Sequence, residues 1–415
     1  MKIRLYLVFF LICTSLPLHA QRTISGVVKG ADNQERLPFA DIIIKGTNQG
    51  TSTNVDGHFA LMDLPDTALI LQVIYVGYAP TEIQIEAGKT DIKNLEVKLS
   101  SGVVLDEVVV SGKSFKVMNA SEGISTVQLS PAQLALLPNV GEVDIFRSLQ
   151  LLPGVSGSNE SSSGLFVRGG TPDQNLVLLD GMTVYNVDHF FGFFSAFNAD
   201  AIKDVKLFKG AFPAKYGGRL SSVVDLTGKT GDPNKLHSNV GINLLNAKAS
   251  VQIPLFKKGS LSFSGRRSYT DIIRSGLYND IFGVFSQTDQ PPDIEGLDVT
   301  TLEPDFYFFD LNSKLSFNPT EKDVVAFSFY SGADHLIELN DIRLERGMNP
   351  TILIELDVDE TSDWGNKGFS GKWSRQWGAK WYSNLIIASS KYFSEYNQDV
   401  DVKVTLVEQD KIGRA

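Results

Sequence analysis

The sequence predicts a mainly β protein in three successive parts: a β-sandwich, an α/β domain, and the first strands of a transmembrane antiparallel β-barrel. Three observations support this fold class. Short β-rich runs separated by turn residues fill positions 22–100, as in a small sandwich. Capped helical segments and glycine-flanked strands share residues 113–233. From residue 234 onward, apolar and polar residues alternate with period two, and short turns alternate with long connections.

Residues 1–20 have the features of a secretory signal peptide. Lys2 and Arg4 precede an apolar run from Leu5 to Leu18, and Ala20 is a small residue at the expected cleavage site. The run is too short for a comfortable transmembrane helix, although an uncleaved anchor is the alternative. Cys13 is the only cysteine and lies inside this segment. The rest of the chain therefore has no disulfide, cysteine nucleophile or cysteine-based zinc site.

Charge and hydropathy argue against a nucleic-acid-binding protein and against a helical membrane protein. The chain has 415 residues, a formal net charge of −10 and no concentrated basic stripe, which argues against nucleic acid as a partner. No segment after residue 20 contains 18 uninterrupted apolar residues. A membrane-embedded form would have to be a β-barrel, because only helices and closed barrels satisfy their backbone groups inside lipid.

Residues 21–101 are predicted to form a transthyretin-like or Ig-like β-sandwich. The expected strands are Ile24–Val28, Ala40–Lys45, His58–Met62, Leu69–Tyr75, Glu82–Ile85 and Leu95–Leu99, and glycines such as Gly46, Gly77 and Gly88 separate them. The stretch from Pro38 to Phe59 resembles the carboxypeptidase-regulatory-like domain. Despite its name, that family implies no peptidase activity.

Residues 102–112 form a linker with an extended segment. Two acids, Asp106 and Glu107, lead into three β-branched residues, Val108, Val109 and Val110. A free segment of this kind can add itself as a strand to another protein's sheet, and the alternative is one more strand of the sandwich. The segment resembles a TonB box, which implies a TonB-type energy-coupling protein as its periplasmic partner.

Residues 113–233 are predicted to form the α/β domain. Helices are expected at Ala132–Leu137, after the Ser130-Pro131 start signal, and at Val143–Leu151. Asp180-Gly181 between apolar runs predicts a hairpin. Four motifs resemble the TonB-dependent receptor plug in the order of that family: Gly164–Gly170, Leu178–Gly181, Ile202–Val205 with Lys209-Gly210, and Tyr216–Arg219.

Two groups of residues in this domain are candidates for functional contacts. Arg168 and Arg219 lie in glycine-flanked motifs, and guanidinium groups there would pair with carboxylates of the barrel wall. The alternative is that both are ordinary surface arginines. Tyr185, His189, Phe190 and Phe191 belong to an unusually aromatic run that would line a ligand-facing tip of the plug. Core packing is the alternative for that run.

Residues 234–415 are predicted to form the N-terminal part of an outer-membrane barrel. Leu261 and Phe263 alternate with Ser262 and Ser264, as a wall with one apolar and one polar face requires. Short turns are expected at 254–259, 318–323 and 374–379, and long connections at 271–304 and 331–366. Three tryptophans near one short turn, Trp373, Trp377 and Trp381, are typical of an interfacial girdle. The alternative is a large soluble sandwich.

The strand count suggests that the barrel is unfinished. We expect seven or eight strands, depending on whether 236–253 is one strand or two. The resembled receptors have more strands and end in an aromatic residue, whereas this sequence ends at Arg414-Ala415. A C-terminally truncated receptor is therefore expected.

Enzymatic and metal-binding interpretations have little support in the sequence. His335 and Glu338 form an H-x-x-E pair, but no later histidine completes a zinc ligand set. No phosphate-binding loop, dinucleotide fingerprint or G-x-S-x-G motif appears, so we predict no enzyme and no cofactor. Acidic residues between Asp280 and Asp305, and between Glu355 and Asp363, would suit calcium, with a solvated surface as the alternative.

The resemblances imply a receptor of the bacterial outer membrane. Such a receptor binds a scarce solute, such as an iron chelate or a glycan, and admits it to the periplasm when the TonB-type partner pulls on the box. Outer-membrane lipid and a surface-exposed substrate-binding lipoprotein are further partners that this class implies. Two alternatives remain: a cell-surface binding, signalling or adhesion module without transport, and a secreted peptidase accessory protein.

Overall fold

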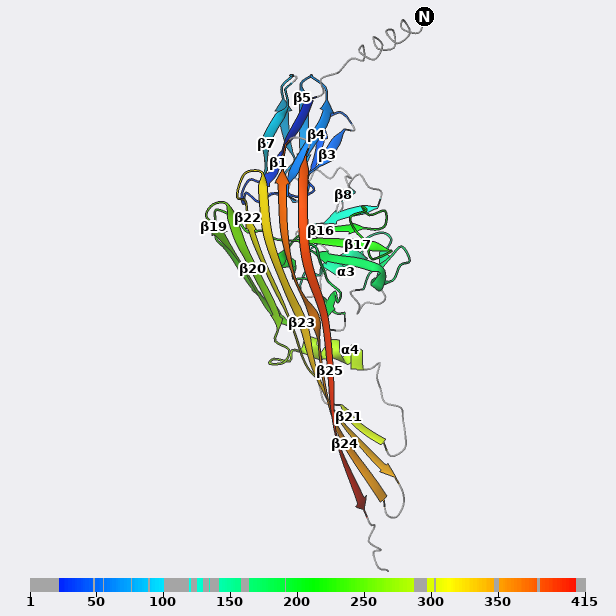
Figure 1. Cartoon of the computed structure of the whole chain (residues 1–415). Coiled ribbons are helices and arrows are strands. Elements are labelled where there is room, and N and C mark those ends of the chain that lie inside the picture. Colours follow the sequence, from blue (N-terminus) through cyan, green and yellow to red (C-terminus); the bar gives the residue numbers. More distant parts are fainter. Residues whose placement is uncertain are drawn as a thin grey trace, which may run out of the picture. The chain divides into compact units, whose positions relative to one another are not determined.

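The computed structural model describes residues 22–47, 49–54, 56–75, 77–88, 90–100, 119–120, 125–129, 134, 142–157, 164–190, 192–286, 297–301, 304–346, 351–378 and 381–407 (Figure 1). The predicted signal peptide and the predicted TonB box lie outside these residues. The chain divides into two compact units. One is mainly the N-terminal sandwich, and the other contains the α/β domain and the long strands that follow it. Each is described by itself.

The N-terminal unit is a sandwich of two sheets. Its strands are β1 (Arg22–Gly30), β2 (Asp41–Ile44), β3 (Gly50–Ser52), β4 (His58–Leu64), β5 (Leu69–Ile74), β6 (Thr81–Ile85) and β7 (Ile92–Leu99). One sheet has the order β4-β1-β7, with β1 and β7 parallel, and the other has the order β3-β2-β5-β6. Alternate residues of both sheets form a buried core that includes Ile24, Val28, Ile42, Leu71 and Val97. The strands predicted from the sequence are present, and only the short β3 was missed.

The turn before β4 shows why the Asn54–Gly57 segment has its sequence. The Asn54 side-chain oxygen accepts hydrogen bonds from the backbone N–H groups of Asp56 and His58. Gly57 has a φ of +74°, and a Cβ there would lie 2.9 Å from the carbonyl oxygen of Val28. Only glycine fits both the positive φ and this close approach.

The α/β domain is built on a mixed six-stranded sheet of order β13-β12-β17-β16-β9-β8. Its elements are β8 (Asn119–Ala120), β9 (Thr126–Leu129), α3 (Ile145–Gln150), β10 (Val155–Ser156), β11 (Phe166–Val167), η1 (Pro172–Gln174), β12 (Asn175–Leu179), β13 (Met182–Thr183), β14 (Asp188–His189), β15 (Phe194–Ser195), η2 (Ala199–Ala201), β16 (Ile202–Phe208) and β17 (Ser222–Gly228). The pair β12–β17 is parallel and the other pairs are antiparallel. Helix α3 buries Ile145, Phe146 and Leu149 in the core of the domain.

Two local predictions in this domain are confirmed. The helix expected at Val143–Leu151 is α3, and Asp144 caps it by accepting a hydrogen bond from the Arg147 N–H at 2.9 Å. The predicted hairpin joins β12 to β13, with Asp180 at a φ of +49° and Gly181 at +86°. Of the helix expected at Ala132–Leu137, the structure describes only Leu134, which is helical and buried.

The following strands form one antiparallel sheet, which we call the wall. It contains β18 (His237–Ile242), β19 (Asn246–Leu255), β20 (Gly259–Ser268), β21 (Leu297–Thr301), β22 (Asp305–Phe317), β23 (Asp323–Arg346), β24 (Thr351–Gln376) and β25 (Tyr382–Val407). Its order follows the chain, except that the short β21 pairs with β23. Residues 236–253, for which one or two strands were possible, belong to two strands. Helix α4 (Gly276–Ser286) precedes β21.

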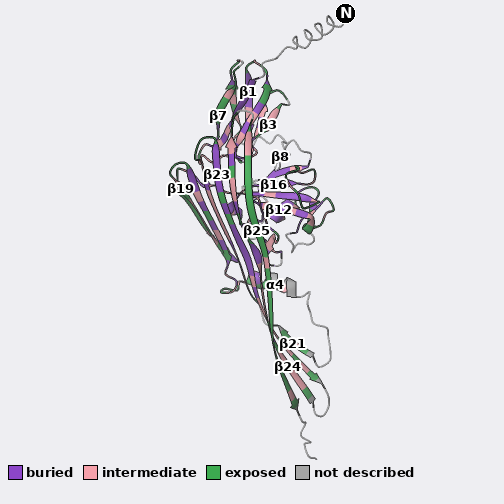
Figure 2. Cartoon of the chain, viewed as in Figure 1, coloured by how far each residue is buried: buried purple, intermediate pink, exposed green. Residues whose placement is uncertain are grey.

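The predicted alternation of wall residues is confirmed in β20. Ser262, Ser264 and Arg266 are buried on the face toward the α/β domain, whereas Phe263 on the opposite face is 41% exposed. β23 continues the pattern: Ser328 and Tyr330 are buried, and Phe327 is 57% exposed. Figure 2 shows this mixture of buried and exposed positions along the wall strands. Among the described residues, no helix has the length and hydropathy needed to cross a membrane.

The prediction that 271–304 and 331–366 are long structureless loops is wrong. The first contains α4 and β21, and the second is mostly strand, since β23 has 24 residues and β24 has 26. A strand of 26 residues is about 85 Å long, whereas about 10 residues cross an outer membrane. The alternation of aliphatic and acidic residues in 354–359 is a strand pattern that the high acidic content obscured.

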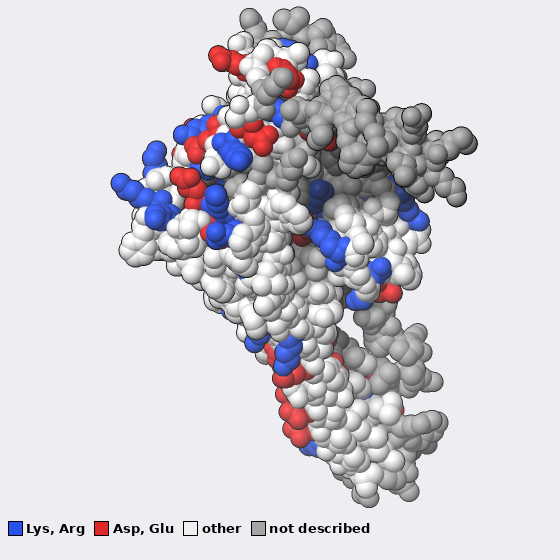
Figure 3. Space-filling model, turned by 45° about the horizontal axis from the view of Figure 1, so that its top comes forward, with Lys and Arg blue, Asp and Glu red and all other residues white. Residues whose placement is uncertain are grey.

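Acidic side chains gather along the end of the wall that contains the start of β24 and the end of β25 (Figure 3). Glu355, Asp357 and Asp359 alternate along β24, and Asp399 and Asp401 along β25. In a strand, alternate residues are spread by almost 7 Å. No group of three potential metal ligands converges within the described part of the chain.

Candidate functional site

The interface between the α/β domain and the wall, which we call the seam, contains a histidine held between two wall carboxylates. His189 on β14 places Nδ1 2.7 Å from Asp334 Oδ2 on β23 and Nε2 2.9 Å from Asp310 Oδ1 on β22. All three side chains are at most 2% exposed. The imidazole also stacks on Phe308, with ring centroids 4.5 Å apart. The Phe190 N–H donates to Asp334 Oδ1. Asp334 therefore binds the His189 side chain with one oxygen and the Phe190 backbone with the other.

Arg266 on β20 links the other side of Asp310 to the α/β domain. Its Nε lies 2.8 Å from Asp310 Oδ2, and Nη2 donates to the same carboxylate oxygen and to the carbonyl oxygen of Ser195. Nη1 donates to Glu142 Oε1, just before helix α3. The planar guanidinium therefore contacts Asp310 on β22, Ser195 on β15 and Glu142 through its several N–H donors.

Tyr330 completes the contacts of Asp310. Its hydroxyl lies 2.8 Å from the carbonyl oxygen of Ala196 and 3.2 Å from Asp310 Oδ1, so its one proton has two acceptors. Asp310 therefore faces only donors: His189, Arg266 and Tyr330. A buried carboxylate in such surroundings is kept ionised by its partners.

The pKa values of both residues of β14 are raised, but with opposite consequences for the stability of the docked domain. Burial would lower the pKa of His189, but the Asp310 and Asp334 carboxylates outweigh burial and raise that pKa to about 10. Burial raises the pKa of Asp188 to about 6, because the attraction of His189 compensates only part of the desolvation. His189 therefore favours the docked state as a cation, whereas ionised Asp188 opposes it.

We expect Asp188→Asn to increase the stability of the docked domain at neutral pH. A raised carboxyl pKa means that docking loses stability as pH rises from about 4 to 6, and the amide removes this loss. The expected gain is about 1–3 kcal/mol above pH 6 and close to zero below pH 4. Urea unfolding of the domain at pH 4 and 7.5 measures both values. An equal gain at the two pH values would contradict the explanation by charge.

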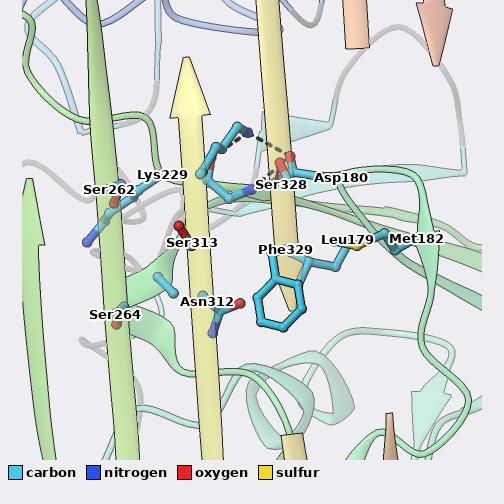
Figure 4. Close-up of a pocket in the computed structure, with 13 residues that line it drawn as sticks. Leu179, Asp180, Met182, Lys229, Ser262, Ser264, Asn312, Ser313, Ser328 and Phe329 are labelled. Carbon is cyan, nitrogen blue, oxygen red and sulfur yellow. Dashed lines mark hydrogen bonds and ion pairs between the residues drawn. The ribbon is translucent and has the colours of Figure 1, made fainter. Parts of the chain in front are cut away.

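A second polar anchor lies at the predicted hairpin (Figure 4). Asp180 Oδ1 accepts a hydrogen bond from Lys314 Nζ at 2.7 Å, and Oδ2 accepts one from the Ser328 hydroxyl at 3.0 Å. Lys314 also donates to the carbonyl oxygen of Gly228. Burial would raise the pKa of Asp180, but Lys314 and the hydrogen bonds hold it below its usual range. The hairpin is thus fixed to β22 by an ion pair and to β23 by a hydrogen bond.

A third anchor is the Asn366 side-chain amide, which forms hydrogen bonds with backbone groups as a neighbouring strand would. Asn366 Oδ1 on β24 accepts hydrogen bonds from the backbone N–H groups of Tyr185 and Asn186, and Asn366 Nδ2 donates to the Asn186 carbonyl oxygen. Asn366 is 4% exposed. The pairing satisfies backbone groups of an irregular segment that would otherwise be buried without partners.

The structure places the four predicted tip residues differently from one another. His189 and Phe190 are each 2% exposed, and Phe190 belongs to an aromatic cluster with Phe194, Tyr278, Phe306 and Phe308. Both side chains are buried, as the packing alternative expects, and their contact with a ligand stays a prediction. Tyr185 is 52% exposed, and its contact with ligand stays a prediction. Phe191 lies outside the described residues.

The two predicted plug arginines do not take part in the seam formed by these strands. Arg168 and Arg219 are exposed, and Arg219 Nη1 donates to the carbonyl oxygen of Gly218. Neither makes an ion pair within the described part of the chain, so pairing with barrel carboxylates stays a prediction. His335 and Glu338, the weak zinc motif, face opposite sides of β23, where His335 Nδ1 pairs with Asp363 at 2.6 Å.

Sequence reasoning missed Asp310, Asp334, Arg266 and Lys314 as partners of the α/β domain. One signal was available. Charged residues at inward positions of otherwise serine-rich strands, such as Arg266 after Ser262 and Ser264, indicate a buried ionic partner. The partner itself could not be identified, because His189 and Asp310 are 121 residues apart in the sequence.

Comparison with known proteins finds two domains in the chain. Residues 24–110 match the model of the CarboxypepD_reg-like domain, and residues 124–224 match the TonB-dependent receptor plug domain. A TonB-dependent receptor of Formosa agariphila is 32% identical over 52% of this chain and 21% of its own length. The TonB-dependent receptor SusC of Bacteroides thetaiotaomicron is 27% identical over 62% of this chain and 24% of its own length. The chain therefore spans about a quarter of these relatives.

Solved structures show similarity to receptors as well. The siderophore receptor PirA of Pseudomonas aeruginosa aligns with 68% of this chain and 53% of its own length, with 16% sequence identity and a TM-score of 0.36.

Proposed function

Because the chain contains a CarboxypepD_reg-like domain and a TonB-dependent receptor plug domain, we propose that it acts as an outer-membrane TonB-dependent uptake receptor of the Bacteroidetes type. The α/β domain is the plug and the wall is part of the transmembrane barrel. The transported solute is an iron chelate, a glycan or another scarce nutrient. This is a role in transport, not in catalysis.

One structural observation carries the proposal: the plug has its own core and meets the wall through a limited set of contacts, which are polar anchors and one aromatic cluster. Among the described residues of the main plug core, only Tyr330 comes from the wall. The anchors are the His189–Asp310–Asp334 group, Arg266 with Glu142, the Asp180–Lys314 pair and the Asn366 amide. A domain joined in this way can be displaced by breaking a few contacts, without loss of its own core.

The energy for this displacement would come from a TonB-type partner in the periplasm. We propose that Asp106–Val110 is the segment that this partner binds by strand addition. Strand addition relies on main-chain hydrogen bonds, and a proline within the segment removes one donor and resists pairing.

We expect Val109→Pro in the full-length receptor to abolish capture of the purified periplasmic domain of TonB. Val109→Thr is the matched control, because a β-branched residue keeps the extended backbone and its N–H. Pull-down from outer-membrane extracts measures capture. Growth on a panel of ferric chelates or oligosaccharides, as the only iron or carbon source, measures uptake. If Val109→Pro still captures TonB and supports growth, Asp106–Val110 is not the box.

A surface-exposed substrate-binding lipoprotein is proposed as a second partner, since SusC is among the relatives. Affinity purification of the receptor from outer membranes tests this association. Recovery without any co-purifying lipoprotein would contradict it and leave the transport proposal intact.

A further inference from the structure

The geometry around His189 requires both ring nitrogens to donate. Nδ1 faces Asp334 Oδ2 at 2.7 Å and Nε2 faces Asp310 Oδ1 at 2.9 Å. A neutral imidazole has one N–H and one lone pair, so its lone pair would face a carboxylate oxygen. With both carboxylates ionised, only the imidazolium, with two N–H groups, satisfies both contacts.

The alternative site for this second proton is an aspartate carboxyl, but both aspartates accept N–H hydrogen bonds, which favour the ionised form. Asp310 accepts hydrogen bonds from Arg266 as well as from His189, and Asp334 Oδ1 accepts one from the Phe190 N–H. Phe308 stacks on the imidazole from β22. Tyr330 and Arg266 reach Asp310 from β23 and β20.

The charge balance of the cluster favours the imidazolium. Asp188 precedes His189 on β14, and the carboxylates of Asp144 and Glu142 lie beyond it, with Glu142 paired to Arg266. With His189 neutral, Arg266 would be the one cation among the described residues that contacts Asp310, and Arg147 lies near Asp144 instead.

We propose that His189 is a positioning residue that docks the plug on the wall only in its doubly protonated form, so that displacement of the plug releases one proton from this imidazole. The reaction is an acid dissociation: the imidazolium N–H bond breaks, its electron pair stays on the ring nitrogen, and water takes the proton. The inference rests on the proposed function only where TonB provides the displacement.

The direction of the pH dependence follows from linkage. The docked pKa of about 10 lies above the ordinary value of about 6.5 that a released, hydrated histidine regains. The stabilisation is therefore complete below pH 6.5 and decreases as pH rises to about 10. Within this window the equilibrium constant for plug release is expected to rise about tenfold per pH unit. At the pH of the periplasm, a released plug must regain a proton before it docks again.

A single cysteine on the plug measures this release without TonB. Ala201 is 7% exposed in the seam, and Cys13, the only cysteine of the chain, lies in the predicted signal peptide. The full-length receptor with Ala201→Cys as its sole cysteine is labelled with a maleimide between pH 7 and 9. Each rate is divided by the rate of a cysteine peptide at the same pH. We expect the corrected rate to rise about tenfold per pH unit.

Three variants identify His189 as the source of the slope. His189→Gln should label faster at pH 7 and show no slope, because glutamine cannot carry the proton. His189→Arg should remain flat while keeping a cation between the aspartates. His237→Gln is the matched control, since His237 pairs with Asp232 outside the seam, and should keep the slope. A flat profile in the parent, or an equal slope in His189→Gln, overturns the proposal.

A spectroscopic readout keeps the proposal testable if the His189 variants do not fold. The receptor is labelled with ¹⁵N-histidine after every other histidine, including His58, His237 and His335, is replaced by glutamine. At pH 8, His189 should show two protonated ring nitrogens. A neutral imidazole at that pH contradicts the proposal, whereas loss of growth in the Val109→Pro test would not affect it. The two proposals therefore fail independently.

Discussion

Asp310→Ala is expected to lower the free energy of unfolding of the plug by about 3–5 kcal/mol, because it leaves two buried cations without their shared partner. His189 Nε2 lies 2.9 Å and Arg266 Nε 2.8 Å from this carboxylate, and the Asp310 side chain is fully buried. Removal of one member of a buried ion group costs more than the group contributes as a whole, since the remaining charges keep their desolvation penalty.

Denaturant unfolding of the plug in the full-length receptor, followed by thiol labelling at Ala201→Cys, measures this loss. The matched control is Asp305→Ala on the same strand, whose side chain is 50% exposed and pairs with Arg274. A surface pair of this kind contributes about 0–1 kcal/mol. Similar losses in the two variants would contradict the explanation that burial of the Asp310 charge determines the cost of its removal.

The replacement of all charges at once should be far less damaging. A quadruple variant, Asp310→Leu with His189→Phe, Arg266→Met and Asp334→Asn, removes the His189 cation together with both carboxylates that pair with it, and leaves Glu142 without Arg266. Its stability should therefore exceed that of Asp310→Ala. It should also lose the pH dependence that His189 confers, which separates the structural role of the cluster from its role in release.

The fold was largely predictable because most of its signals are local. Turn glycines and period-two runs located the sandwich strands, and Asp180-Gly181 located the β12–β13 hairpin. The wall could be predicted from Ser262 and Ser264 alternating with Leu261 and Phe263. The extent of β23 and β24 was not predicted, because acidic residues at alternate positions were interpreted as loop composition.

The seam was less predictable because its contacts depend on how distant segments dock. His189 was identified as notable among aromatic residues, but its neighbours in sequence suggested an exposed tip. Its burial follows from Asp310 and Asp334, on strands more than 100 residues away. Arginines in recognisable motifs, Arg168 and Arg219, attracted the prediction of plug–barrel pairing. The wall instead supplies the arginine of the seam, Arg266, and the plug supplies an acid.

Phe308→Ala is expected to destabilise the plug by about 3–5 kcal/mol, the usual effect of truncating a buried phenylalanine. Phe308 is 1% exposed and packs in the aromatic cluster with Phe190 and Phe194. Its ring also faces His189 at 4.5 Å and the Arg266 guanidinium at 5.0 Å. The substitution therefore removes both apolar volume and the ring face on which the two cations rest.

Phe308→Leu separates these two contributions, because leucine keeps most of the volume but has no π face. We expect it to cost less than the alanine variant and still to weaken docking by about 1–2 kcal/mol. Phe327→Ala on the opposite face of the wall, where the ring is 57% exposed, should change plug stability by less than about 0.5 kcal/mol. If Phe327→Ala matched Phe308→Ala in the same denaturant titration, the loss would report general damage to the wall. A loss confined to Phe308 would instead place part of the docking energy in the aromatic support beneath His189 and Arg266.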